Sequence, residues 1–246
     1  MNTTRRTASA VIVCGTLALT AGCGGGSTVK HAAAAASATT STSTSVSAPV
    51  KAGSGDAILA EAIADTKAAS SVHVTGTGSA GETLDLLIAS GKGCHASVTT
   101  GDSTAGLVRI GSRDWMLINA DNVQTVSGTS IPEARAALGK YAQVDGGDPA
   151  ISKLAPRCDL SAQLDAAITD TTGLSVGPAT TVDGVKAVTL TSGTGETALV
   201  SAGADPLVLR VTAPGSGGGT VNFGDYGKAA AITAPTAAQT VSASDQ

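Results

Sequence analysis

The chain has 246 residues and a formal net charge of −4, with 19 acidic against 15 basic side chains. This mild acidity, with a pI near 5.2, excludes the basic surface by which proteins bind nucleic acids or anionic lipid headgroups. Aromatic residues make up only 2% of the chain and 31 residues are glycine, so small and β-branched side chains have to build the core.

The first 22 residues have the three parts of a secretory signal. Arg5 and Arg6 precede an apolar stretch at residues 8–21, and small residues then lead to Cys23. The apolar stretch is shorter than the ~20 residues that a membrane-spanning helix needs. The sequence Thr-Ala-Gly-Cys that ends at Cys23 resembles the lipobox of bacterial lipoproteins, which implies cleavage before Cys23 and a lipid on its sulfur. The alternative is an ordinary signal peptide, which would leave Cys23 unmodified.

Composition divides the remaining chain into a tether, one domain and a tail. Residues 23–55 are rich in Gly, Ala, Ser and Thr and lack apolar periodicity, which predicts a disordered, lipidated tether. Residues 56–240 form a single predicted domain of ordinary size, and residues 241–246 a disordered tail. We therefore expect an exported protein, anchored by its lipid at the outer face of the cell membrane.

The predicted domain opens with a helix and continues as strands. Asp56 is expected to cap a helix that ends near Lys67, because apolar residues recur there at helical spacing. Alternating residues between Gly-rich or Asp-bearing turns then predict strands at residues 72–74, 84–88, 95–99, 107–110 and 115–118.

The pattern becomes helical in the middle of the domain. Ser130 and Glu133 form a capping box for a helix through Leu138, Pro149 begins a short helical piece, and Asp159 caps a third helix. Strands return at residues 185–191, 197–201, 207–211 and 221–223. The order predicts an α+β fold, with one curved antiparallel sheet, a half-barrel, and helices packed in its concave face.

Alternation along the strand at residues 207–211 predicts which side chains face the interior. Leu207, Leu209 and Val211 are expected to point toward the helices and to line any cavity there, whereas Arg210 and Thr212 face water. Trp115, the only tryptophan, is expected either in the core or at the mouth of such a cavity.

The cysteines predict one disulfide. Cys14 leaves with the signal and Cys23 is expected to carry lipid, so Cys94 and Cys158 remain as a pair in an oxidising compartment. The alternative for this pair is a metal site, but the spacings that supply further ligands are absent from the sequence.

No catalytic constellation is evident in the sequence. Residues 101–106 superficially resemble the nucleophile loop of trypsin-like proteases, but Thr104 stands where glycine follows the serine, so a hairpin turn is favoured. His31 lies in the tether, and His73 and His95 lie on strands without a recognisable partner spacing. We expect neither an enzyme nor a bound metal or cofactor.

Short motifs at both ends of the domain resemble those of one family. They are Ser-Ser-Val-His-Val at 70–74 after the first helix, Ala-Leu-Val-Ser at 198–201 before Pro-Leu-Val-Leu at 206–209, and Phe-Gly-Asp-Tyr-Gly at 223–227 before Ile-Thr-Ala-Pro at 232–235. With the lipobox, they resemble the LppX/LprAFG family of envelope lipoproteins from high-GC Gram-positive bacteria. The resemblance implies a LolA-like half-barrel that encloses an apolar cavity, which some members use for acylated lipids.

Three functional hypotheses from different classes follow, of which a hydrolase is the least favoured because the catalytic constellation is missing. The first is a monomeric carrier that binds an apolar ligand, such as an acylated lipid or glycolipid, between sheet and helices. The alternative is an envelope interaction module that uses the same domain without a cavity. A disulfide between Cys94 and Cys158 would tie the early strands to the helices and restrict opening of a cavity.

Overall fold

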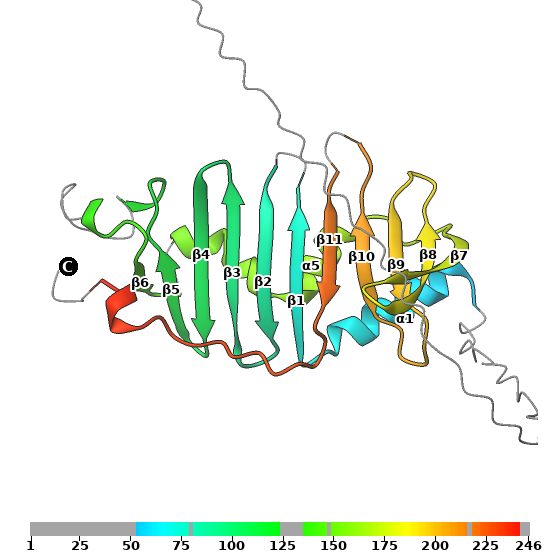
Figure 1. Ribbon diagram of the computed structural model, residues 1–246, viewed down its shortest axis with the longest axis horizontal. Coiled ribbons are helices and arrows are strands. Elements are labelled where there is room, and N and C mark those ends of the chain that lie inside the picture. The colour runs from blue at the N-terminus through cyan, green and yellow to red at the C-terminus, as the bar shows by residue number, and fades with distance from the viewer. Residues whose placement is uncertain (1–52, 79–80, 124–134, 147–148, 216–217, 242–246) are drawn as a thin grey trace, which may run out of the picture. The chain divides into compact units, whose positions relative to one another are not determined.

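The computed structural model describes residues 53–78, 81–123, 135–146, 149–215 and 218–241. Its elements follow the predicted order of a helix, a run of strands, helices and a second run of strands (Figure 1). The elements are α1 (Gly55–Lys67), β1 (Ser71–Thr77), β2 (Thr83–Ala89), β3 (Gly93–Thr100), β4 (Ser103–Ile110), β5 (Arg113–Leu117), β6 (Tyr141–Val144), α4 (Pro149–Ser152), η1 (Ala155–Cys158), α5 (Leu160–Ala167), β7 (Ser175–Val182), β8 (Val185–Thr191), β9 (Thr197–Ser201), β10 (Val208–Thr212), β11 (Thr220–Gly224) and η2 (Ala237–Gln239).

The described strands form one open antiparallel sheet. The strand order is β6-β5-β4-β3-β2-β1-β11-β10-β9-β8-β7, so two meanders, β1 to β6 and β7 to β11, are joined where β1 pairs with β11. The segment between β6 and β7 supplies α4, η1 and α5. The α+β class predicted from the sequence, with a single antiparallel sheet and helices on one face, is confirmed.

The face of the sheet that the helices cover, here called the inner face, carries the main core. Apolar side chains of α1 and α5 pack there against alternate residues of the strands. Helix α1 contacts β9 and β10, and η1 contacts β2 and β3. The largest fully buried side chains are aliphatic, as the scarcity of aromatic residues requires: Leu59, Leu86, Leu107, Met116, Ile118, Ile151, Leu164, Leu190, Val72, Val74, Val200 and Val208.

Helix α1 begins two residues earlier than predicted, and this corrects the role of Asp56. The N-cap is Ser54, whose hydroxyl accepts a hydrogen bond of 3.3 Å from the backbone N–H of Ala57. Asp56 instead accepts bonds of 3.1 and 2.8 Å from the backbone N–H groups of Gly173 and Leu174, which lower the pKa of its carboxyl group. The sequence pattern could not distinguish the two acceptors, because both suit a helix start.

The helical middle of the domain is described in part. The predicted capping box at Ser130 and Glu133 lies outside the described residues. Helix α4 begins at Pro149. Asp159 caps α5 as predicted, since its carboxylate accepts hydrogen bonds from the backbone N–H groups of Ser161 and Ala162.

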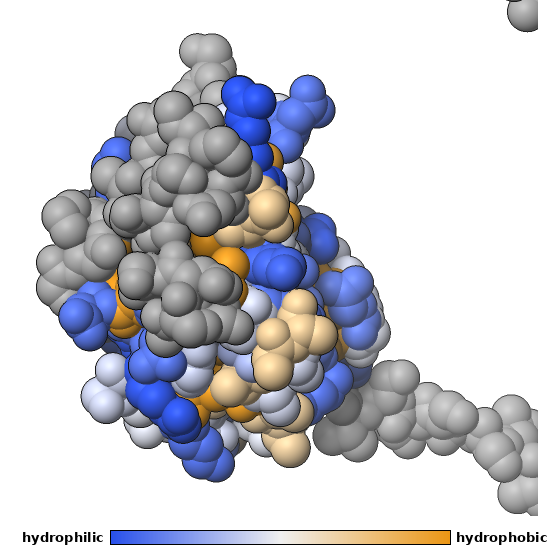
Figure 2. Space-filling model, turned by 90° about the vertical axis from the view of Figure 1, so that its left-hand side faces the viewer, coloured by the Kyte–Doolittle hydropathy of each residue, from blue (hydrophilic) through white to orange (hydrophobic). Residues whose placement is uncertain are grey.

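Two strands at the edges of the sheet, β6 and β7, were not predicted from the sequence. Strand β6 has only four residues, and seven of the eight residues of β7 are exposed or half-buried, so neither shows an apolar alternation. The segment after β11 runs along one end of the strands toward β6 (Figure 1), where Thr240 forms a parallel bridge with Tyr141. Seen from the β6 end, hydrophilic side chains divide the apolar surface into small areas (Figure 2).

A β-bulge in β10 overturns part of the predicted orientation of that strand. The register with β9 shifts between Val208 and Arg210, so Leu209 is the extra residue. Val208 therefore joins the main core, although strict alternation predicted that it would face away. Leu209 lies in a small second cluster with Val182 and Ala187 on the opposite, outer face, so its assignment to the interior was wrong.

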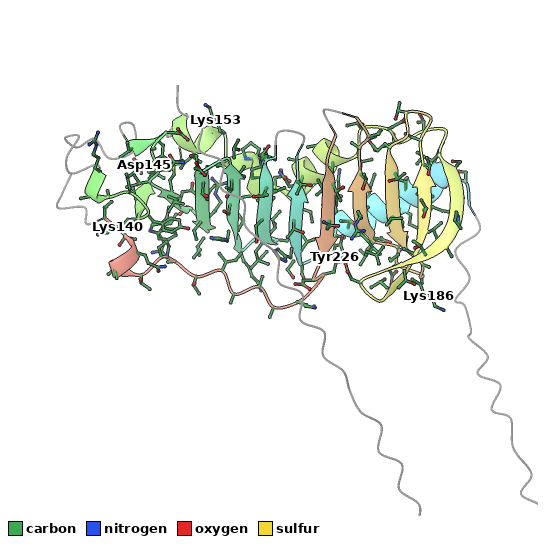
Figure 3. All side chains as sticks on the ribbon, turned by 45° about the horizontal axis from the view of Figure 1, so that its top comes forward. Lys140, Asp145, Lys153, Lys186 and Tyr226 are labelled. Carbon is green, nitrogen blue, oxygen red and sulfur yellow. A yellow bond between two sulfur atoms is a disulfide. The ribbon has the colours of Figure 1, made fainter. Side chains whose placement is uncertain are left out.

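Side chains from distant elements hold the bulge. The backbone N–H of Val208 donates to the hydroxyl of Thr66 in α1 at 3.0 Å, and its carbonyl accepts from the hydroxyl of Tyr226. Both side chains thus satisfy backbone groups that the shifted ladder exposes in the interior. Tyr226, labelled in Figure 3, lies just after β11, and its burial raises the pKa of its hydroxyl.

The structure joins Cys94 and Cys158 in the disulfide that the sequence predicts. Cys94 is a buried inner-face residue of β3 and Cys158 ends η1, with their Cα atoms 5.5 Å apart. The bond therefore fastens the helical segment to the sheet. No helix of the described residues is long and apolar enough to cross a membrane.

Candidate functional site

The candidate site is a pocket of about 250 Å³ between the inner face of the sheet and α5. We call it the sheet–helix pocket. Its apolar lining comes from the sheet, through Leu84, Val211 and Val221, and from α5, through Ala166 and Ala167. Convergence of apolar side chains from a sheet and a helix is the usual construction of a site for an apolar ligand.

Two glycines on the sheet side of the pocket lie against the backbone of a neighbouring strand. A Cβ added at Gly219 would lie 2.1 Å from the carbonyl oxygen of Thr77, and one added at Gly76 would lie 2.9 Å from that of Thr220. Both glycines line the pocket. Close approach of the β1 and β11 backbones therefore requires glycine at these positions.

Arg157 and Glu82 form an ion pair among the residues that line the pocket. The Nη2 atom of Arg157 lies 3.4 Å from Oε1 of Glu82, and each side chain is about one third exposed (35% and 34%). Arg157 belongs to η1 and immediately precedes Cys158, so the disulfide holds its backbone next to the sheet. This pair could not be predicted from the sequence, because its members are 75 residues apart and share no motif.

Only one of the four predicted cavity residues lines this pocket. Val211 does, with 2% of its surface exposed. Leu207 is half-buried before β10 begins, and Leu209 lies on the outer face because of the bulge. Trp115 is buried beside Arg113, whose guanidinium lies 5.3 Å from the ring centroid, but neighbouring Met116 is the residue that points into the main core.

Two larger hollows lie elsewhere on the described part of the domain. One, of about 590 Å³, is lined mainly by Thr, Ser, Asp and Asn side chains around Thr75 and Thr99. The other, of about 690 Å³, lies beside the disulfide, between the β2–β3 turn and the start of α5. Charged residues contribute to the second, among them Lys67, Lys92 and Arg109. The second hollow also has an apolar lining, from Ile88 and Ala89 of the sheet and from Leu160 and Ala162 of α5. Of these three hollows, the sheet–helix pocket is the one lined by a predicted cavity residue, Val211.

Two of the residues considered for catalysis, His73 and Ser103, have structural partners. His73 lies 3.0 Å from Asp85 and its second ring nitrogen 3.8 Å from Asp225. Ser103 begins β4 after the hairpin turn and donates to Asp121 at 2.6 Å, which fits the interpretation of residues 101–106 as a turn. Within the described residues, no group of three or more His, Cys, Asp or Glu side chains could hold a metal ion.

Comparisons with known proteins find similarity among solved structures. No family model and no curated protein matches the chain. The structure of LprF from Mycobacterium bovis is 13% identical, covers 74% of this chain and 96% of its own, and superposes with a TM-score of 0.47. The lipoprotein LppX from Mycobacterium tuberculosis is 15% identical, covers 73% of this chain and 98% of its own, and has a TM-score of 0.46.

A third structure, of an uncharacterized conserved protein from Thermus thermophilus, is 13% identical, with 75% and 96% coverage and a TM-score of 0.34. LprF and LppX carry the names of the family that the sequence motifs resemble. The architecture of this chain rests on its own strand order and register.

Proposed function

We propose that this protein is an exported lipoprotein, anchored at the outer face of the cell membrane through Cys23, which binds the acyl part of a lipid in the sheet–helix pocket. The observation that carries the proposal is the pocket itself, with its apolar walls of Leu84, Val211 and Val221 facing α5. The predicted tether, which ends before the N-cap residue Ser54, would hold the domain away from the membrane surface, as a monomer.

The size of the pocket limits what it accepts in this conformation. Its volume of about 250 Å³ is slightly below the ~300–1,000 Å³ of ligand sites for drug-sized molecules. The pocket thus accommodates the end of an acyl chain, and a longer ligand requires α5 to move. The segment around α5 is held at both ends, by the disulfide at Cys158 and by Glu196, which accepts hydrogen bonds from Thr169.

Two valines of β10 provide a matched test. Val208 and Val211 both belong to the main core, with 0% and 2% exposure, but only Val211 borders the pocket. Val211→Trp should place its indole in the pocket, lower the recovery of bound lipid and change the melting temperature little. Val208→Trp lacks that space and should destabilise the domain by ~1–3 kcal/mol through overpacking.

The measurement is organic extraction and mass spectrometry of the full lipidated chain purified from membranes, combined with thermal melts. The lipid on Cys23 is covalent and remains with the protein, so extracted lipid reports the pocket. Absence of extractable lipid from the wild type, together with equal destabilisation by both tryptophans, would rule out the carrier proposal.

The second candidate function is an envelope interaction module. The observation in its favour is that aliphatic side chains of the sheet and helices fill most of the inner face, and that the segment of α5 is fastened at both ends. Under this alternative the wild type carries no lipid, and crosslinking in intact cells should capture protein partners of the anchored chain.

A further inference from the structure

We infer that the sheet–helix pocket selects lipids with an anionic group, a carboxylate or a phosphate, which Arg157 binds in exchange for Glu82. The inference rests on the proposed binding of an acyl chain in the same pocket. It adds the chemical class of the head group and the residue that recognises it.

The contact between Arg157 and Glu82 is weak enough for an anionic ligand to replace Glu82. It is a single contact of 3.4 Å, between two side chains that are each about one third exposed. The pair of Arg109 and Asp114 on the same face shows the opposite construction, with two hydrogen bonds of 2.7 and 2.9 Å and an Asp114 side chain that is 4% exposed. A guanidinium has five N–H donors, so Arg157 keeps several of them available for a ligand.

The backbone of Arg157 is held in place before any ligand arrives. Pro156 restricts the chain on one side, and its carbonyl accepts a hydrogen bond of 3.1 Å from the buried side chain of Gln163. The disulfide of Cys158 fixes the other side to β3. An arginine presented from a fixed backbone loses less freedom on binding, and its planar fork matches a carboxylate or a phosphate with two parallel hydrogen bonds.

Arg157 is the one positively charged residue among the described residues that line the pocket. Glu82 and Arg157 are the two charged residues among the described residues that line the pocket. A neutral head group would leave this pair intact and gain no ionic contact. An anionic head group would form a two-point contact with Arg157, which replaces the single contact of 3.4 Å between Arg157 and Glu82. Glu82 would then turn to solvent at small cost, because its side chain is already partly exposed.

The test compares ligands that differ only in charge. The full chain, stripped of extractable lipid, is titrated with a fatty acid and the fatty alcohol of the same length, and with a lysophosphatidic acid and the matching monoacylglycerol. We expect Arg157→Gln to weaken both anionic ligands about tenfold or more. Glu82→Gln should strengthen them, because it removes the competing carboxylate. Both substitutions should leave the neutral ligands unchanged.

Controls separate recognition from general charge and from folding. Lys153→Gln and Lys186→Gln each remove one positive charge from exposed positions outside the pocket lining (Figure 3) and should leave all affinities unchanged. Arg157→Lys keeps the charge without the planar fork and should retain part of the preference. If Arg157→Gln fails to fold, the response of Glu82→Gln decides the question.

The outcomes separate this inference from the proposed function. Equal binding of charged and neutral lipids, or anionic binding that neither Arg157→Gln nor Glu82→Gln changes, would overturn the inference and leave the acyl pocket standing. Failure of all four ligands to bind would overturn the proposed function together with it. The fatty acid and the lysophosphatidic acid further distinguish a carboxylate from a phosphate as the preferred group.

Discussion

Loss of the disulfide between Cys94 and Cys158 should lower the free energy of unfolding by about 4 kcal/mol. The two cysteines are separated by 64 residues, and the chain-entropy model gives about this value for closing a loop of that length in the unfolded chain. For a domain of this size, 1 kcal/mol corresponds to ~2–4 °C, so we expect the melting temperature to fall by roughly 8–16 °C.

The two single substitutions should differ, since the cysteines differ in burial. Cys94 is 1% exposed on the inner face, whereas Cys158 is partly buried. Cys158→Ala removes the crosslink and leaves a thiol that still fills its place in the core. Cys94→Ala also removes buried volume, so it should destabilise the domain further by the cost of a small cavity, ~1 kcal/mol.

The assay is urea unfolding of protein isolated from its native compartment, with and without reductant, beside thiol counting on the denatured chain. The wild type should show no free thiols from these positions before reduction and should lose stability on reduction. A reduced chain, verified by its thiol count, that unfolds at the same urea concentration as the oxidised chain would refute the reasoning.

Three further predictions concern the anchor, the bulge and the first helix. Cys23→Ser should abolish both signal cleavage and membrane retention, which fractionation and labelling with a fatty-acid probe can measure; undiminished labelling would contradict the assigned anchor. Tyr226→Phe leaves the carbonyl of Val208 without its donor and should cost ~1–3 kcal/mol in urea unfolding, whereas an unchanged midpoint would mean that the bulge does not depend on this bond. The lowered pKa of Asp56 means that the folded state favours its ionised form, so its contribution is complete above the unfolded value near 3.8 and is lost as the pH falls through the folded value. Acid unfolding curves of the wild type and Asp56→Asn should therefore differ at neutral pH and converge at low pH, and a constant difference would count against this linkage.

Local patterns identified most of the elements. Helix α1, the strands of the first meander up to β5, and the cap of α5 at Asp159 all follow from apolar periodicity and from polar residues that bond nearby backbone groups. Strands β6 and β7 were not predicted because they lie at the edges of the sheet. There one or both faces are open to solvent, so apolar and polar residues need not alternate.

The residues of the site were predictable only in part. Val211 was predicted from alternation, and the pair of Cys94 and Cys158 from the number of cysteines left after the predicted signal and anchor. Leu209 was misplaced because a bulge reverses alternation, and this bulge depends on Thr66, which lies 142 residues before Val208. A sequence pattern does not contain such a contact, since the two residues meet only when α1 packs on β10.

The sequence by itself determined the α+β class, the order of the elements and the pairing of the two cysteines, because each depends on local periodicity or on composition. It also contains a signal-like start and a lipobox-like ending at Cys23, which predict the anchor. Only the tertiary structure decided which face of β10 is inner, what Asp56 binds, and that Arg157 meets Glu82 at a pocket. These features join residues far apart in the chain, and their geometry arises from packing of helices against the sheet.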